Sequence, residues 1–228
     1  MRWRMIIPAV VLILASCSAK TGINTVLKDY ENDYSEVNVQ VLQVSIPDNK
    51  EYEQQLNQSF LQESDEFIAG FDKEAKESSS VSRYGAKSVL EITQTVNCNE
   101  NDFISVTEEA YVYTGGAHGM NVRKTRNIDT LANSEITLAD LFSEEGYEET
   151  LNRMINEVKE KHPQEYCELW EQPRIKEEQD FYLTADDLVI YYQPYELSYY
   201  ARGFVEFPIR LTGLKGYMKE EYNRLIKE

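Results

Sequence analysis

The chain has 228 residues, with 23 Lys or Arg against 40 Asp or Glu, so its formal net charge at pH 7 is −17. A chain this acidic repels nucleic acid and anionic lipid headgroups, which argues against a nucleic-acid partner, and the same field attracts a basic partner. The length fits about one domain, or one domain of two closely associated halves, and is enough to bury a sizeable core.

The first residues predict an export signal. Arg2 and Arg4 precede a short apolar run that ends in the sequence Leu-Ala-Ser-Cys at Cys17. The run is shorter than the roughly 20 residues of a membrane-spanning helix, and small residues before a cleavage point are typical of secretory signals. Leu-Ala-Ser-Cys resembles the lipobox of bacterial lipoproteins, in which the cysteine is lipidated; the alternative is an ordinary signal peptide with a chance cysteine.

These features predict a signal peptide over 1–16 and lipidation at Cys17. The expected location is therefore the cell envelope, outside the cytoplasm, with the membrane reached through the lipid anchor alone. The outer membrane is preferred, because the residue after Cys17 is not the acidic one that directs some lipoproteins to the inner membrane.

Residues 17–36 are polar and are predicted to form a tether. Alternation then predicts a strand over 37–46, and apolar residues at helical spacing predict a helix to about residue 76, capped by Asp48 or Asn49. Further alternating runs over 88–96, 103–114 and 120–128 predict an antiparallel meander of strands after this helix. A polar turn at 97–102 has oxygen donors but lacks the spacing of a known calcium loop, so a solvated turn is favoured.

A second group of elements follows. The pattern predicts a helical region over 137–161, a hairpin of strands over 181–184 and 188–192, a loop or short helix over 193–203, a strand over 204–211 and a polar helix over 215–227. The predicted fold class is therefore α+β, with antiparallel strands in two groups, each packed with a helix, plus a C-terminal helix. The domain is expected to span 37–228, with an N-terminal part over 37–97 and a C-terminal part over 98–228.

Two cysteines remain once Cys17 carries lipid. An exported location permits a disulfide between Cys98 and Cys167, but their separation in space is not given by the sequence. The alternative is a pair of buried thiols that behave as small apolar residues.

A glycine-rich connection carrying His118 is the first candidate site. It joins the strands predicted over 103–114 and 120–128, and it contains Gly115, Gly116 and Gly119, with Tyr113 just before it. No nucleophile motif such as Gly-x-Ser-x-Gly occurs, and no second His or Cys stands at metal-ligand spacing, so no catalytic residue, metal or cofactor is predicted. We expect the glycines to provide positive φ or close backbone approach, and His118 to bond a backbone or tyrosine group or to contact a ligand.

The second candidate is a group of tyrosines. Several of them alternate in strands and are expected to be half-buried. Tyr195, Tyr199 and Tyr200 instead lie with Arg202 in the loop over 193–203, where large aromatic side chains are harder to bury. Tyrosine offers a large contact area and a polar tip, so this loop is predicted to bind a partner.

The order of several short motifs resembles the extracytoplasmic domain of RsiV-type anti-sigma factors. They are Tyr-Thr-Gly-Gly-Ala-His-Gly at 113–119, Asn-Ile-Asp at 127–129, Ile-Thr-Leu-Ala-Asp-Leu-Phe at 136–142, Phe-Tyr-Leu at 181–183, Leu-Val-Ile-Tyr-Tyr at 188–192, Pro-Tyr-Glu-Leu at 194–197 and Tyr-Ala-Arg-Gly at 200–203. That domain also occurs in bacterial lipoproteins of unknown function, and related modules precede some peptidoglycan deacetylases. In RsiV-like proteins it binds lysozyme.

The resemblance implies the fold and a partner surface. Together with the export signal it leads us to expect a lipid-anchored protein that binds a protein or glycan ligand at the envelope, with a basic protein such as lysozyme or peptidoglycan fragments as partners. The residues expected to contact the ligand are Tyr113, Gly115, Gly116, His118, Tyr195, Tyr199, Tyr200 and Arg202. The sequence shows no transmembrane helix, no sigma-binding segment and no polysaccharide-deacetylase module, so signalling and deacetylation are not expected. The alternative is an enzyme: a cell-wall glycan hydrolase with His118 as base, or a module associated with a deacetylase.

Overall fold

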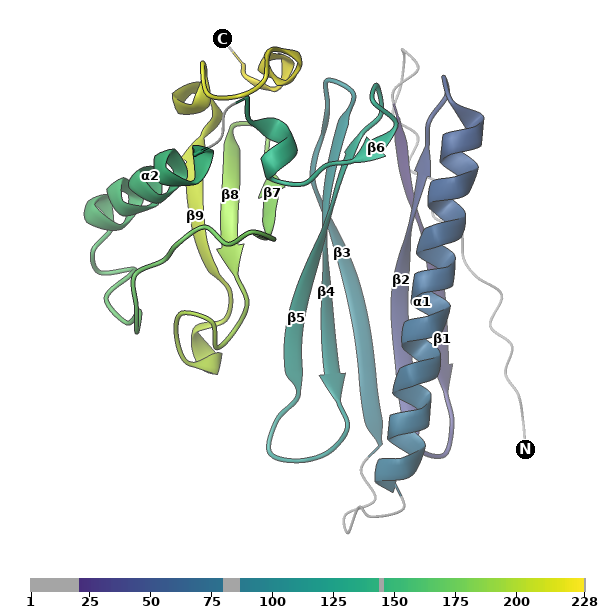
Figure 1. Ribbon diagram of the computed structural model, residues 1–228. Helices are drawn as coiled ribbons and strands as arrows, with labels where there is room; N and C mark the ends of the chain where they lie inside the picture. Colours follow the sequence, from purple (N-terminus) through teal and green to yellow (C-terminus); the bar gives the residue numbers. More distant parts are fainter. Residues whose placement is uncertain (1–20, 80–86, 144–145, 228) are drawn as a thin grey trace. The chain divides into compact units, whose positions relative to one another are not determined.

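A computed structural model describes residues 21–79, 87–143 and 146–227 of the chain (Figure 1). The chain divides into two compact units: the first contains residues up to Gln94 together with Glu108–Val122, and the second contains Thr95–Thr107 and Arg123 onwards. The predicted signal peptide and Cys17 lie outside the described residues. The α+β fold class is confirmed, with a six-stranded mixed sheet beside a long helix and a three-stranded antiparallel sheet beside a shorter one.

The larger sheet contains six strands in sequence order: β1 (Gly22–Glu31), β2 (Ser35–Ser45), β3 (Ser88–Glu100), β4 (Phe103–Tyr113), β5 (Met120–Asp129) and β6 (Ser134–Glu135). β1 and β2 are antiparallel, with Val26 opposite Val41. β2 and β3 are parallel, with Val37 opposite Leu90, because the helix α1 (Lys50–Ser79) carries the chain back between them. This one parallel pair makes the sheet mixed.

β1 corrects the prediction of a tether over 17–36. Residues 22–31 form a full strand, in which every second side chain is half-buried. The inward positions include Lys28 and Tyr30, whose polar tips reach α1: the Lys28 ammonium bonds Asp65 at 2.7 Å, and the Tyr30 hydroxyl donates to Asp72. Polar residues that bury their stems in this way give no hydrophobic alternation, which is why the sequence pattern missed the strand.

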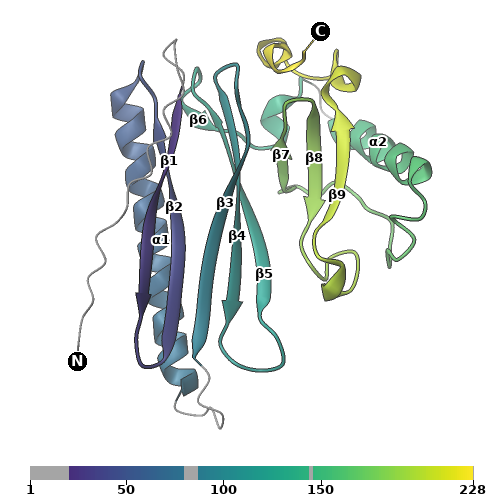
Figure 2. The ribbon, with the colours of Figure 1, turned by 180° about the vertical axis from the view of Figure 1, so that it is seen from behind.

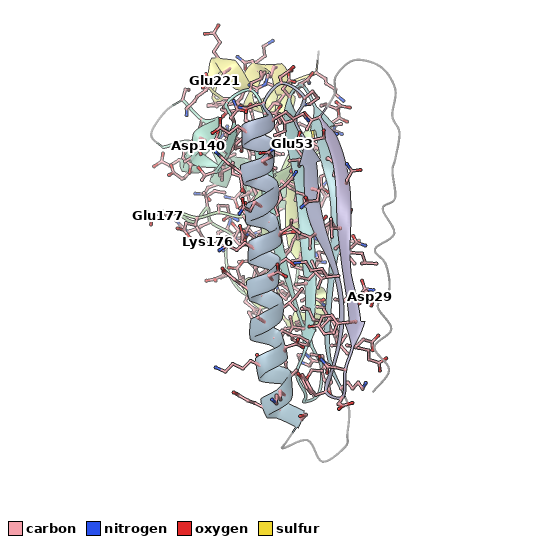
Figure 3. All side chains as sticks on the ribbon, turned by 90° about the vertical axis from the view of Figure 1, so that its right-hand side faces the viewer. Asp29, Glu53, Asp140, Lys176, Glu177 and Glu221 are labelled. Atoms are coloured by element: carbon pink, nitrogen blue, oxygen red, sulfur yellow. The ribbon has the colours of Figure 1, made fainter. Side chains whose placement is uncertain are left out.

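The core of the first unit lies between α1 and β2. Asn49 caps α1, as one of the two predicted candidates, by accepting the Tyr52 N–H at 3.0 Å. The helix runs along β1 and β2, and Asp29 of β1 lies on the side away from it (Figure 3). Its buried side chains recur at helical spacing and face the buried valines of β2: Leu56, Phe60, Ile68, Phe71 and Ala75.

The predicted boundary between an N-terminal part over 37–97 and a C-terminal part over 98–228 differs from the observed division. Glu108–Val122 belongs to the first unit. Two side-chain bonds join it there: Gln94 Nε2 donates to Glu108 at 2.8 Å, and Thr114 Oγ donates to Glu74 of α1 at 3.0 Å. A hairpin therefore returns a later part of the chain to the earlier unit.

The second unit packs three strands against a helix. The strands β7 (Phe181–Leu183), β8 (Asp187–Tyr192) and β9 (Val205–Arg210) are antiparallel in that order, and α2 (Tyr147–Lys161) contacts β9 (Figures 1 and 2). Leu151 and Ile155 of α2 are fully buried against the strand side chains, which include Phe207. The predicted helical region over 137–161 is broken into a short 3₁₀ turn, Ala139–Leu141, and α2.

The C-terminal segment is helical as predicted, but with 3₁₀ geometry over Leu211–Leu214 and Glu220–Leu225. Tyr222 and Leu225 are buried, and the Arg224 guanidinium lies 2.7 Å from the buried Asp129 carboxylate. Fixed anchors on both sides of a short segment favour tight turns over a regular α-helix. Within the described part of the chain, no helix is both long and apolar enough to cross a membrane.

Cys98 and Cys167 are free thiols, so of the two alternatives the structure has no disulfide between them. Cys98 is buried in the core of the second unit, where burial raises the pKa of its thiol. Cys167 is exposed, and its Sγ donates to the Gln164 carbonyl at 3.1 Å. The alternative of two buried thiols therefore holds for Cys98 alone.

Candidate binding surface

The glycine-rich connection between β4 and β5 belongs to the first unit, and its shape depends on its glycines. Gly115 and Gly116 have φ of 115° and 101°, a region that side chains rarely adopt. Gly119 lies close to another side chain: an added Cβ would lie 2.4–2.6 Å from the end of the Tyr111 ring, so this ring would have to shift. The predicted structural roles of the three glycines, positive φ and close approach, are confirmed.

His118 is exposed at the end of this connection. Its Nδ1 lies 2.8 Å from the carbonyl of the next residue, Gly119, so the predicted bond to a backbone group is confirmed. Tyr113 behaves similarly, since its hydroxyl donates to the Gly116 carbonyl at 3.2 Å. Over residues 21–79, 87–143 and 146–227, no group of three or more His, Cys, Asp or Glu side chains is arranged to hold a metal ion.

The loop between β8 and β9, residues 193–203, belongs to the second unit and is called here the tyrosine loop. It contains buried Leu197 and Ser198, and exposed Tyr195 and Tyr199. The rings of Tyr195 and Tyr200 lie 5.5 Å apart at 30°. The prediction that this loop is hard to bury is therefore confirmed for two of its tyrosines.

Tyr195 also has an unusual backbone. Its φ is 73°, a left-handed value that costs a residue with a side chain about 1–2 kcal/mol. Glu196 fixes this turn, because its carboxylate accepts the Gln193 N–H at 2.7 Å and its own N–H donates to the Gln193 carbonyl at 3.1 Å. Strained residues of this kind are concentrated at functional sites.

A second segment, residues 165–170, lies directly beside the tyrosine loop. The Trp170 N–H donates to the Leu197 carbonyl at 2.9 Å, and Ser198 Oγ donates to the Glu168 carbonyl at 3.0 Å. The Tyr199 hydroxyl donates to the Glu168 carboxylate, a bond that raises the pKa of the tyrosine. The Arg202 guanidinium donates to the Glu165 carbonyl at 3.0 Å, so Arg202 fastens the two segments together.

The two segments bring a set of exposed aromatic side chains to one region of the second unit. Trp170 is 61% exposed, Tyr195 48% and Tyr199 41%. We call these three residues, together with the half-buried Tyr200 beside Tyr195, the aromatic surface. Glu165 and Glu168 of the second segment are exposed, as is Glu171, the residue that follows it. Exposed rings among carboxylates suit contacts with sugar rings or with basic side chains.

The sequence interpretation found the tyrosines but missed their neighbour Trp170. Residues 167–178 follow no period, so nothing in the pattern placed Trp170 beside Leu197. A pairing between two irregular segments that are distant in sequence leaves no periodic pattern. The one available signal is a tryptophan in a polar segment. The residues Tyr113, Gly115, Gly116 and His118 belong to the first unit, and Tyr195, Tyr199, Tyr200 and Arg202 belong to the second.

The first residue of the tyrosine loop, Gln193, is bonded by two residues of other elements, Arg123 and Asp180. Gln193 Oε1 accepts the Arg123 N–H at 3.0 Å, and its Nε2 donates to the Arg123 carbonyl at 2.7 Å and to Asp180 at 3.0 Å. The Arg123 guanidinium lies 4.0 Å above the centre of the Phe204 ring and pairs with the Glu206 carboxylate. Tyr191 completes this region, and its burial raises the pKa of its hydroxyl.

Comparisons with known proteins divide the chain in a similar way. Residues 28–121 match the family model described as Deacetylase PdaC, and residues 139–212 match the model described as Protein of unknown function (DUF3298). The chain therefore carries a region similar to the PdaC family, followed by a region similar to the DUF3298 family. No curated protein matches this chain.

Two solved structures share the fold. A DUF3298 family member from Bacteroides fragilis NCTC 9343 is 16% identical, with a TM-score of 0.71 over 90% of this chain and 96% of its own. A DUF3298 family protein from Pseudomonas aeruginosa PAO1 is 18% identical, with a TM-score of 0.65 over 91% of this chain and 97% of its own. At these identities the likeness shows the fold alone.

Proposed function

We propose that this protein is a non-enzymatic binding protein of the cell envelope that holds a protein or glycan ligand on its aromatic surface. The observation that carries the proposal is the position of Tyr195, which is exposed at a strained φ of 73° beside Tyr200. An exposed aromatic side chain on a strained backbone does not stabilise the folded protein. It does offer a partner a rigid ring with a large contact area.

Envelope association is supported by the two matched domains and by the expected lipoprotein signal. One matched family is named for a deacetylase. Modules related to the RsiV-type domain, which this sequence resembles, precede some peptidoglycan deacetylases. Lipidation at Cys17 would anchor the chain to the membrane. Metabolic labelling with a palmitate analogue tests this step: wild type is expected to incorporate the label and Cys17→Ser to lose it, and equal labelling of both would refute the anchor.

The partner that we favour is a basic protein, and lysozyme is the sharpest form of the proposal because RsiV-like domains bind it. The formal charge of −17 favours encounter with a cationic protein. The Glu168 carboxylate accepts the hydroxyl of the exposed Tyr199, so a Lys or Arg side chain of a partner can meet a carboxylate and a ring at one place.

Binding is best tested with immobilised c-type lysozyme and, separately, with soluble peptidoglycan fragments. Trp170→Ala and Tyr195→Ala are expected to weaken binding by about tenfold or more each, because central aromatic side chains carry much of the energy of an interface. Tyr217→Ala is the matched control, since Tyr217 is 42% exposed but lies outside the two segments of the aromatic surface.

The two ligand classes differ in their response to salt. Binding of lysozyme is expected to weaken as salt rises, because exposed charges are screened, whereas stacking of a neutral glycan is expected to change little. Binding of neither ligand at low salt would overturn the proposal in both forms. Equal losses in Tyr217→Ala and Tyr195→Ala would place the ligand elsewhere.

A further inference from the structure

The tyrosine loop is fixed at both of its ends by one residue of a different strand. Arg123 of β5 bonds Gln193, the first residue of the loop, through its backbone N–H and carbonyl at 3.0 and 2.7 Å. Its guanidinium lies 4.0 Å from the centre of the ring of Phe204, the residue that follows the loop. The backbone of Arg123 therefore holds the start of the loop, and its side chain holds the end.

The side chain of Arg123 is well suited to this position. It is 12% exposed, and besides Phe204 it lies 5.2 Å from the centre of the Tyr191 ring and pairs with Glu206 of β9. A planar guanidinium can stack on a ring and bond a carboxylate in the plane at the same time, which an ammonium cannot do. An arginine among aromatic rings and one carboxylate is thus a rigid spacer between β5 and the start of β9.

Gln193 is equally constrained. Its amide group makes three hydrogen bonds, the third of them from Nε2 to the Asp180 carboxylate at 3.0 Å. Asp180 immediately precedes β7, so Gln193 ties the loop to the start of this strand and to β5, which is 70 residues away in sequence. An amide with fixed donors and acceptors on both sides has one orientation only.

We propose that Arg123 and Gln193 form a clamp that positions the tyrosine loop for ligand binding without being part of the surface that the ligand touches. They are positioning residues, since neither belongs to the aromatic surface and Arg123 is largely buried. The dependence of binding on the clamp rests on the proposed function, whereas the dependence of loop order on the clamp does not. The two are therefore measured separately.

Amide hydrogen exchange of the full chain measures loop order without a ligand. The reporters are the N–H groups of Glu196, Arg202 and Gly203, which donate within the loop at 3.1, 3.0 and 2.9 Å. Arg123→Met and Gln193→Ala are each expected to speed exchange of these amides by about tenfold or more, while amides of the β8–β9 ladder keep their wild-type rates. Arg153→Met is the matched control, because Arg153 makes only an exposed pair with Glu157 of its own helix.

Arg123→Lys separates positioning from charge. Lysine keeps the charge opposite Glu206 but loses the stacked plane, so its effect on the reporters is expected to lie between wild type and Arg123→Met. If circular dichroism shows that Arg123→Met fails to fold, Arg123→Lys and Gln193→Ala carry the test. Wild-type exchange rates in both of these variants would overturn the clamp.

Binding to immobilised lysozyme or peptidoglycan fragments then completes the test. Arg123→Met and Gln193→Ala are each expected to lower the affinity for whichever ligand wild type binds by about tenfold. Faster loop exchange with unchanged affinity would refute the link between the clamp and binding. If wild type binds neither ligand, the proposed function fails, and the exchange rates alone still decide whether the clamp orders the loop.

Discussion

The two connections that the sequence marks as unusual are built differently. In the β4–β5 connection Gly115 and Gly116 supply the φ values, Tyr113 and His118 bond carbonyls of the same connection, and Thr114 bonds Glu74 of α1. The tyrosine loop is held from outside, by residues 165–170, by Asp180 and by Arg123.

This difference shows what each connection is suited to do. A connection whose shape depends on glycine needs particular backbone conformations. A loop held by three other segments keeps large, exposed rings at fixed positions, which lowers the entropy cost of binding a partner. The glycine-rich connection is therefore best understood as scaffold, and the tyrosine loop as the contact region.

The largest expected effect comes from breaking the scaffold at Gly119. In Gly119→Ala the new methyl group would lie 2.4–2.6 Å from the Tyr111 ring, so the ring must move and the variant is expected to lose about 1–3 kcal/mol of stability. Chemical denaturation of wild type and variant measures this loss.

Gly70→Ala is the matched control, because a Cβ at this position of α1 meets nothing within 4 Å. It is expected to stabilise the protein by about 0.5–1 kcal/mol, since alanine restricts the unfolded chain and favours helix. Combining Gly119→Ala with Tyr111→Ala should remove most of the extra cost. A Gly119→Ala variant as stable as wild type would show that the close approach is not a constraint.

The same contrast explains what the sequence could predict. Period-two and helical alternation identified β2, α1, β4, β5, β8 and β9, and the glycine positions indicated backbone demands that the structure confirms. β1 was missed because Lys28 and Tyr30 fill its inward face with polar-tipped chains. Trp170, Arg123 and Gln193 were missed for another reason: their roles depend on pairings between segments distant in sequence, and a single sequence carries no record of such pairings.

A smaller effect concerns the charge beneath the tyrosine loop. Burial raises the pKa of the Asp180 carboxyl, although the Gln193 bond and nearby Lys176 oppose the shift. Because the folded pKa exceeds the unfolded one, the stability this group contributes is present below the unfolded pKa of about 3.9 and is lost as pH rises through the folded pKa. Asp180→Asn is therefore expected to gain stability relative to wild type at neutral pH, and this gain should shrink in acid.

Asp140 is the control of opposite sign. Burial alone would raise the pKa of its carboxyl, but bonds from the Thr137 N–H at 2.8 Å and hydroxyl at 2.6 Å lower it overall. Its contribution is present above the unfolded pKa and is lost as pH falls through the folded pKa. Asp140→Asn should therefore be less stable than wild type at neutral pH, with the difference fading in acid. Melting temperatures of wild type and both variants, from neutral to acidic pH, measure the two effects. A change in melting temperature of the same sign for both variants at neutral pH would contradict the opposite pKa shifts of Asp180 and Asp140.

The smallest effect is expected at His118. A substitution there tests whether the glycine-rich connection is scaffold or the active site of a glycan hydrolase. His118 is exposed, and its Nδ1 bonds the neighbouring Gly119 carbonyl. His118→Ala is expected to change stability by no more than about 0.5 kcal/mol, as for most surface substitutions, and to leave affinity for lysozyme or peptidoglycan fragments unchanged. Release of soluble fragments from purified peptidoglycan is the second measurement. If wild type releases fragments and His118→Ala does not, His118 acts as the base of a glycan hydrolase, and the glycine-rich connection is then an active site whose backbone serves to present that one side chain.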